Sequence, residues 1–82
     1  MINLRNIITL SDDNEYIVVG KINYENIIYY YLVDINKNEN TKFCFQKENG
    51  LVELNDKDLI QKLIPLFGRQ ALEELNNYIK QN

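Results

Sequence analysis

The stretch from Ile27 to Ile35 constrains this chain most, because it is apolar on both of the faces that an extended strand presents. Successive side chains of a strand point to opposite sides, so Ile28, Tyr30 and Leu32 share one face. The other face carries Ile27, Tyr29, Tyr31 and Val33. A strand that is apolar on both sides needs neighbours and cover, which predicts a central position in a sheet.

Four further runs of strand-forming residues surround this segment, at 6–10, 16–24, 42–48 and 51–54. Turn-forming residues separate them at 11–14, at 25–26 and at Asn49-Gly50. Asn49-Gly50 is the strongest hairpin signal, because a type I′ turn needs two residues that tolerate positive φ. Gly20 lies inside the second run and predicts a bulge or a close approach. The pattern therefore predicts an antiparallel β-meander of about five strands over residues 6–54.

The residues after the strands predict a helix whose amino end is marked by polar side chains. Asn55 is expected to cap the helix, and Asp56 and Asp58 place carboxylates in its first turn, where they meet the helix dipole. Pro65 removes a backbone donor and Gly68 accepts a left-handed conformation, so we expect this helix to end between them. The first helix is thus predicted to begin at Asp56 and to stop near Pro65.

A second helix is predicted from Arg69 to about Gln81, where Leu72, Leu75 and Ile79 recur at helical spacing. This leucine stripe is expected to dock on the sheet, because so short a chain needs the apolar area. Pairing with a copy of itself is the alternative. The predicted fold class is α+β: one domain over residues 1–82, with a meander at 6–54 and a helical part at 56–81 made of two C-terminal helices packed on one sheet face.

Charge and hydropathy argue against several kinds of partner. The net charge of -3 comes from interspersed acids and bases, so the chain lacks the basic surface that nucleic acid requires. No stretch approaches the roughly 18 apolar residues of a membrane span, and the first residues lack the apolar core of a signal peptide. We therefore expect a cytoplasmic protein that binds neither nucleic acid nor a membrane.

The chain also has few residues that could act in catalysis. Cys44 is the only cysteine and histidine is absent, so an intrachain disulfide, a Cys/His zinc site and a histidine-activated thiol are all excluded. Cys44 is expected on the polar side of its strand, opposite Phe43 and Phe45. The paired carboxylates at 12–13 suit a turn, and those at 56 and 58 suit helix initiation. We predict no enzyme and no catalytic, cofactor-binding or metal-binding residues.

Tyrosine is the remaining feature, since five tyrosines cluster on two adjacent predicted strands. Tyrosine suits surfaces that are apolar but still wet. If helices cover one face of the sheet, the other face presents a surface to a partner. The candidate partner contacts are Tyr16, Tyr24, Tyr29, Tyr31 and Val33. The alternative is a sheet that curls into a partial barrel and hides both faces.

The order of these features resembles a family of small uncharacterised bacterial proteins described as YrzB-like, over about residues 6–67. The resemblance rests on the strand and acidic turn at 7–15, on the "Y-x-L" type strand at 29–34, and on the glycine turn, short strand and acidic helix start at 50–59. This chain departs from the family pattern in being less acidic, in having Leu59 where an aromatic residue usually stands, and in its extension after Gly68. The family supplies no established activity, so the resemblance implies a fold and leaves function open.

Two classes of function follow from these observations. The first is a non-enzymatic binding or regulatory module that uses the tyrosine-bearing face to contact another protein or a second copy as a homodimer. An inhibitor that acts through an acidic surface is a variant of this class. The alternative is a small-ligand-binding protein or an enzyme with a pocket between sheet and helices, where Asp34, Glu53 or Asp56 would titrate abnormally.

Overall fold

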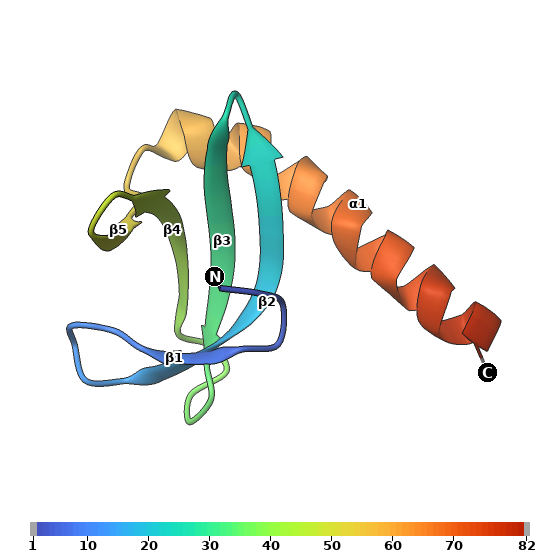
Figure 1. Cartoon of the computed structure of the whole chain (residues 1–82), viewed down its shortest axis with the longest axis horizontal. Helices are drawn as coiled ribbons and strands as arrows, with labels where there is room; N and C mark the ends of the chain where they lie inside the picture. Colours follow the sequence, from blue (N-terminus) through green and yellow to red (C-terminus); the bar gives the residue numbers. More distant parts are fainter. Residues whose placement is uncertain (1, 82) are drawn as a thin grey trace.

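The computed structural model describes residues 2–81 and has five strands followed by one long helix (Figure 1). The strands pair antiparallel in chain order, so the sheet is a meander. It curls into a half-barrel. The elements are β1 (Ile7–Thr9), β2 (Glu15–Tyr24), β3 (Ile27–Asp34), β4 (Thr41–Lys47), β5 (Gly50–Glu53) and α1 (Lys57–Gln81).

The hairpin turns form at residues that tolerate a positive φ. Glu25 and Asn26 both have positive φ, 51° and 67°, and reverse the chain between β2 and β3. The β4–β5 hairpin forms where Asn49-Gly50 predicts one, but its two-residue loop is Glu48–Asn49 and Gly50 is already the first residue of β5. Gly50 has φ 137°, which favours glycine. The predicted hairpin therefore forms with its loop one residue earlier than predicted.

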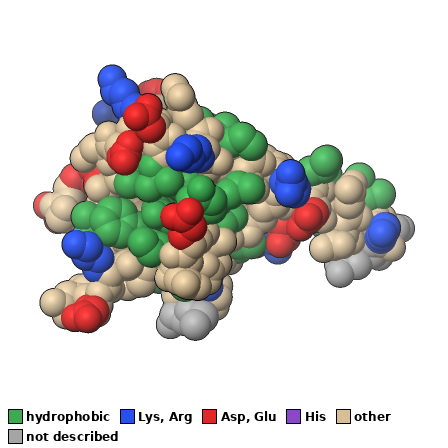
Figure 2. All heavy atoms as spheres, turned by 90° about the horizontal axis from the view of Figure 1, so that it is seen from above, with side chains coloured by type: hydrophobic (Ala, Val, Ile, Leu, Met, Phe, Trp, Pro, Cys, Tyr) green, Lys and Arg blue, Asp and Glu red, His purple; other side chains and the backbone are tan. Residues whose placement is uncertain are grey.

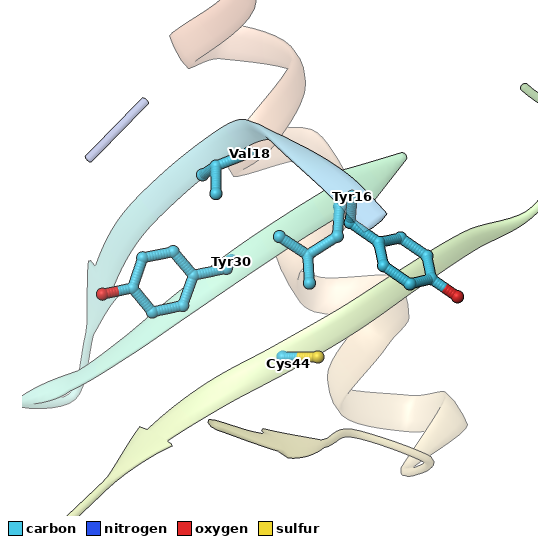
Figure 3. Packing of buried hydrophobic residues seen from close by; sticks show 5 residues of the cluster. Tyr16, Val18, Tyr30 and Cys44 are labelled. Atoms are coloured by element: carbon cyan, nitrogen blue, oxygen red, sulfur yellow. The ribbon is translucent and has the colours of Figure 1, made fainter. Parts of the chain in front are cut away.

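One face of the curled sheet encloses the first core. Figure 3 shows Tyr16, Val18, Tyr30 and Cys44 on the same side of the sheet, and Leu32 completes this cluster of buried residues. The amino-terminal segment contributes Ile2 and Leu4 to it, and Leu51 packs against it from β5. Curvature thus lets the sheet bury this face without a helix, as the partial-barrel alternative anticipates.

Cys44 shows the effect of this curvature on a sequence prediction. The thiol side chain is 2% exposed and belongs to the enclosed core. Cys44 lies on the face opposite Phe43 and Phe45, as expected, but that face is not exposed to water, because the curled sheet encloses it.

The other face of the sheet packs against the first half of α1. Leu63 and Phe67 of the helix are buried with Tyr29 of the sheet, and rings from neighbouring strands surround them. The contacts are between aromatic rings, with Tyr31 stacked on Phe43 at 4.8 Å between centroids and Phe67 5.8 Å from Phe43. This aromatic cluster fixes the helix to the sheet.

The prediction of two C-terminal helices packed on one face is wrong, since α1 runs unbroken through Pro65 and Gly68. Pro65 has no N–H to donate to the Gln61 carbonyl, and both residues lie on the exposed side of the helix. Buried side chains on both sides of the proline, Leu63 and Phe67, hold the two parts in one line. Tertiary packing thus overrides two local signals that favour a helix end.

The second half of α1 leaves the body of the protein and projects into solvent (Figure 1). All residues from 71 to 80 are exposed. The leucine stripe therefore does not dock on the sheet, contrary to the prediction. The reason is geometric, because a continuous helix of 25 residues is longer than the sheet face that its first half already covers.

Candidate functional site

An apolar groove lies where α1 leaves the sheet. It encloses about 520 Å³ and is lined by side chains and backbone from three strands and the helix. The lining residues are Val19, Gly20, Tyr31, Phe43, Ile64, Phe67, Gly68 and Ala71. We call this set the helix–sheet groove. No charged residue belongs to it, so the groove favours an apolar occupant.

The floor of the groove depends on the glycine of β2. The register of β2 against β3 shifts between Val18 and Gly20, so the bulge predicted at this glycine is present. A β-carbon built on Gly20 would lie 2.5 Å from the Phe67 Cδ1 atom. Only glycine lets the Phe67 ring approach the strand so closely, and this approach positions the helix side of the groove.

Gln70 fastens the helix to the same strand one residue further along. Its side-chain oxygen accepts a hydrogen bond from the Lys21 backbone N–H at 2.8 Å, and its side-chain nitrogen donates to the Lys21 carbonyl. β1 pairs with β2 only as far as Ile17, so this part of the β2 edge has no strand beside it. The amide of Gln70 occupies the edge in place of a strand.

The apolar face of α1 continues from the groove along the projecting half of the helix. Ile64, Gly68 and Ala71 line the groove, and Leu75 and Ile79 follow at helical spacing on the same face. Leu72 lies beside them. The exposed fractions are 52% for Ile64, 58% for Leu72, 53% for Leu75 and 61% for Ile79. We call these six residues the apolar stripe, and Figure 2 shows hydrophobic side chains on both the body and the projecting helix.

The candidate contacts from the sequence fall into two groups. Tyr16 and Tyr29 are buried within the chain, with 0% and 6% of their surface exposed. Tyr24, Tyr31 and Val33 are half-buried. Tyr31 alone among the five lines the helix–sheet groove. The structure therefore brings one predicted contact residue to the apolar surface described above, and the others lie elsewhere on β2 and β3.

Tyr16 belongs to a polar network at one end of the half-barrel. Its hydroxyl donates to Asp12 at 2.8 Å and accepts from the Asn40 side chain at 3.1 Å. Asn40 also donates to Asp34 at 3.0 Å. Burial, with the Asp12 hydrogen bond, raises the pKa of Tyr16. This tyrosine thus joins two loops, and its hydroxyl is already engaged on both sides.

Asp34 is the buried carboxylate of this network. It accepts backbone N–H bonds from Asn36 at 2.8 Å and from Lys37 at 3.3 Å, in addition to the Asn40 amide. These bonds, that of Asn36 first, lower the pKa of Asp34. Both carboxylate oxygens accept hydrogen bonds from the following loop, which is the pattern of a carboxylate that holds a loop.

The other two carboxylates expected near a pocket also have structural partners. Glu53 lies 3.3 Å from the ammonium group of Lys42, and this hydrogen bond raises the pKa of Lys42. Asp56 accepts backbone N–H bonds from Asp58 and Leu59 at 3.1 and 3.2 Å. It is therefore the helix cap in place of the predicted Asn55, and α1 begins at Lys57. Neither residue lines the helix–sheet groove.

The single thiol is held in an apolar setting. Burial raises the pKa of Cys44 to about 11, so the thiol is protonated at neutral pH. Within residues 2–81, no cluster of three or more cysteine or carboxylate side chains is placed to hold a metal ion. Across that same range, no helix is long and apolar enough to cross a membrane.

Comparisons of this chain with protein-family models, with curated proteins and with solved structures found no match. The resemblance to YrzB-like proteins thus stays a prediction.

Sequence reasoning identified the leucine stripe but missed the groove. The groove needs Val19, Tyr31 and Phe43 to meet Gly68 and Ala71, which lie more than 20 residues away in sequence. A signal was available in the helical spacing of 64, 68, 71, 75 and 79, which is continuous only if Pro65 and Gly68 are inside one helix. The predicted helix end at Pro65 concealed it.

Proposed function

We propose that this protein is a non-enzymatic binding module that acts in the cytoplasm by contacting another protein chain through the helix–sheet groove and the apolar stripe. The observation that carries the proposal is the continuity of these two surfaces. Leucine and isoleucine side chains more than half exposed run from the groove to the end of the helix. Contiguous exposed apolar surface of this kind is typical of protein interaction sites.

Several features of the site support binding over catalysis. The groove is apolar throughout, and the carboxylates that could serve as acids or bases are bound to backbone N–H groups or lysine at other places. The Cys44 thiol is buried and protonated. An apolar helix face that meets an apolar hollow is the arrangement used to recognise a helical segment of a partner.

Site-specific photo-crosslinking tests this proposal. A photoreactive benzoylphenylalanine replaces Leu75 on the apolar stripe, and a matched variant carries it at Asn77, two residues further on and on a different helix face. After irradiation in the cells that make the protein, we expect protein adducts from position 75 and few from position 77. Equal labelling at the two positions, or none at position 75, would overturn the proposal.

The groove itself favours a second candidate, the binding of a small apolar ligand. Its volume of about 520 Å³ lies in the usual range for small-molecule sites. Gly68→Phe would fill the groove from the helix, because the space around the Gly68 Cα is open. If a small ligand is the natural occupant, the wild type binds an apolar fluorescent dye stoichiometrically and Gly68→Phe does not, while adducts at position 75 are absent.

A further inference from the structure

The apolar stripe changes character along its length. Between Ile64 and Leu72 the stripe has two small residues, Gly68 and Ala71, whereas the projecting end carries a pair of large ones, Leu75 and Ile79. A β-carbon built on Gly68 meets nothing within 4 Å, and both small residues line the helix–sheet groove, so this part of the stripe is an open depression. One molecule thus carries both a hollow and the side chains of a size to enter it.

An antiparallel arrangement of two such helices brings the projecting end of each against the depression of the other. With the pair centred between Ala71 and Leu72, Leu75 of one copy lies opposite Gly68 of the other. Ile79 then lies opposite Ile64. The same contacts occur twice by two-fold symmetry, as in the closed interfaces of most homodimers. A parallel arrangement would instead set Leu75 against Leu75 and Gly68 against Gly68, and would leave both depressions empty.

The projecting half of each helix stands clear of its own half-barrel (Figure 1). The half-barrel lies against the first half of α1, and the second half projects from it (Figure 1). In an antiparallel pair, the two half-barrels therefore lie at opposite ends of the helix pair. The projecting end of each helix reaches the helix–sheet groove of the other copy, where Val19 adds an exposed apolar side chain.

The area available matches what a dimer of this kind requires. With about 200 Å² for a fully exposed leucine or isoleucine, the four large stripe residues expose about 450 Å² on each copy. If the pair covers all of this surface together with Val19 and Ala71, the two copies bury about 1,000 Å² in total, the lower bound for a specific interface. None of the six stripe residues is charged, so the contacts between the two stripes bury no charged side chain of the stripe itself.

We propose that the partner is a second copy of this chain: the two α1 helices pair antiparallel, and Leu75 of each enters the depression beside Gly68 of the other. This inference rests on the proposed binding function, and it identifies the chain that occupies the groove and the apolar stripe.

The mass in solution gives the first test. We expect light scattering to report twice the chain mass of 9.8 kDa at micromolar to millimolar concentration. Leu75→Glu and Gly68→Leu should both return the mass to that of one chain. Asn77→Glu, which introduces the same charge on another face of the helix, should leave the mass unchanged. A wild-type monomer throughout this range, or a dimer that survives both stripe variants, overturns the inference.

Disulfide trapping tests the antiparallel geometry. The two positions 72 lie side by side across the proposed pair, so Leu72→Cys should form a disulfide-linked dimer on mild oxidation. The two positions 79 are about 22 Å apart along the helix axes, so Ile79→Cys should not. Native Cys44 is buried and does not interfere. Cross-linking of both variants would mean parallel helices and would overturn the proposed geometry.

The crosslinking experiment at position 75 separates failure of this inference from failure of the proposed function. An adduct of two copies of this chain supports both. An adduct with a different protein, together with a monomeric wild type, rejects the second copy and leaves the binding function standing. No adduct rejects both.

Discussion

Replacing Gly20 by alanine places a methyl group where the ring of Phe67 already lies. The new β-carbon would be 2.5 Å from Phe67 Cδ1, 2.9 Å from Phe67 Cε1 and 3.2 Å from the β-carbon of Tyr31. The first two distances are shorter than real β-carbon contacts, so the ring has to move. It cannot move freely, because Phe67 is 8% exposed and packs against the rings of Tyr31 and Phe43.

The expected cost of Gly20→Ala is therefore that of overpacking a core, about 2 kcal/mol in the free energy of unfolding. In a domain of this size, such a loss lowers the melting temperature by roughly 10 °C. Urea denaturation followed by circular dichroism measures the free energy, and a thermal scan measures the melting temperature. Gly68→Ala, measured in the Leu75→Glu background where no second copy covers the site, is the matched control. It makes the same chemical change in open space within a helix, and should stabilise the protein by about 0.5–1 kcal/mol.

A double-mutant cycle identifies the ring as the cause. In a Phe67→Leu background the clashing ring atoms are gone, so Gly20→Ala should cost about 1 kcal/mol less than it does in the wild type. Equal costs in the two backgrounds would refute the reasoning, because the penalty would then have a source other than Phe67. A neutral Gly20→Ala in the wild type would refute it as well.

Three further predictions concern other parts of the molecule. Gln70→Ala should destabilise the protein by about 1–3 kcal/mol and speed hydrogen exchange at the Lys21 amide, because that N–H loses its acceptor. Unchanged exchange at Lys21 would contradict the role of Gln70. Cys44 should resist a thiol reagent at pH 8 in the folded protein and react with it in urea, since burial raises the pKa of this thiol to about 11. Fast reaction of the folded protein would contradict this prediction. The stability gained through Asp34 should be fully present above pH about 4, the pKa of an unfolded aspartate, and be lost as the pH falls through its lowered folded pKa. Acid denaturation of Asp34→Asn should accordingly show a weaker dependence on pH than that of the wild type, and identical profiles would contradict it.

The five strands follow the runs read from the sequence because their signals are local. Alternating β-branched and aromatic residues and the turn residues between them determine strand and hairpin without reference to the rest of the chain. The bulge at Gly20 is local in the same sense. Adjacent strands joined by short turns then pair in chain order, which explains why the meander could be read from residues 6–54.

The single helix could not be read in this way. Pro65 and Gly68 each weaken a helix locally, and the gain that outweighs them comes from Leu63 and Phe67 packing against strands that are distant in sequence. The curvature of the sheet is likewise a property of the whole fold. It buries Tyr16 and Cys44 on a face that the sequence pattern left open to a partner or to water.

The site was predictable only to a degree, for the same reason. The helical spacing of Leu72, Leu75 and Ile79 is a local pattern and was recognised. Its exposure depends on α1 continuing in a straight line past the sheet, which follows from the unbroken passage through Pro65. The tyrosine cluster predicted a contact surface on β2 and β3, but of the five candidate residues only Tyr31 lines the groove. The direction of each ring depends on the register of the strands and on where the helix crosses them, which the sequence does not specify.

The projecting half of α1 gains its helical conformation without contacts to a hydrophobic core. An isolated helix of about ten residues is marginal in water, because the entropy of ordering its backbone is not offset by packing. The first half of α1, which is packed on the sheet, supplies the helix nucleus from which the second half extends. Any chain that covers the apolar stripe adds the burial of apolar surface that the second half otherwise lacks. The extent of helix beyond Ala71 is therefore thermodynamically linked to occupancy of the stripe. If the occupant is a second copy, as proposed, far-ultraviolet ellipticity per residue rises with protein concentration by mass action.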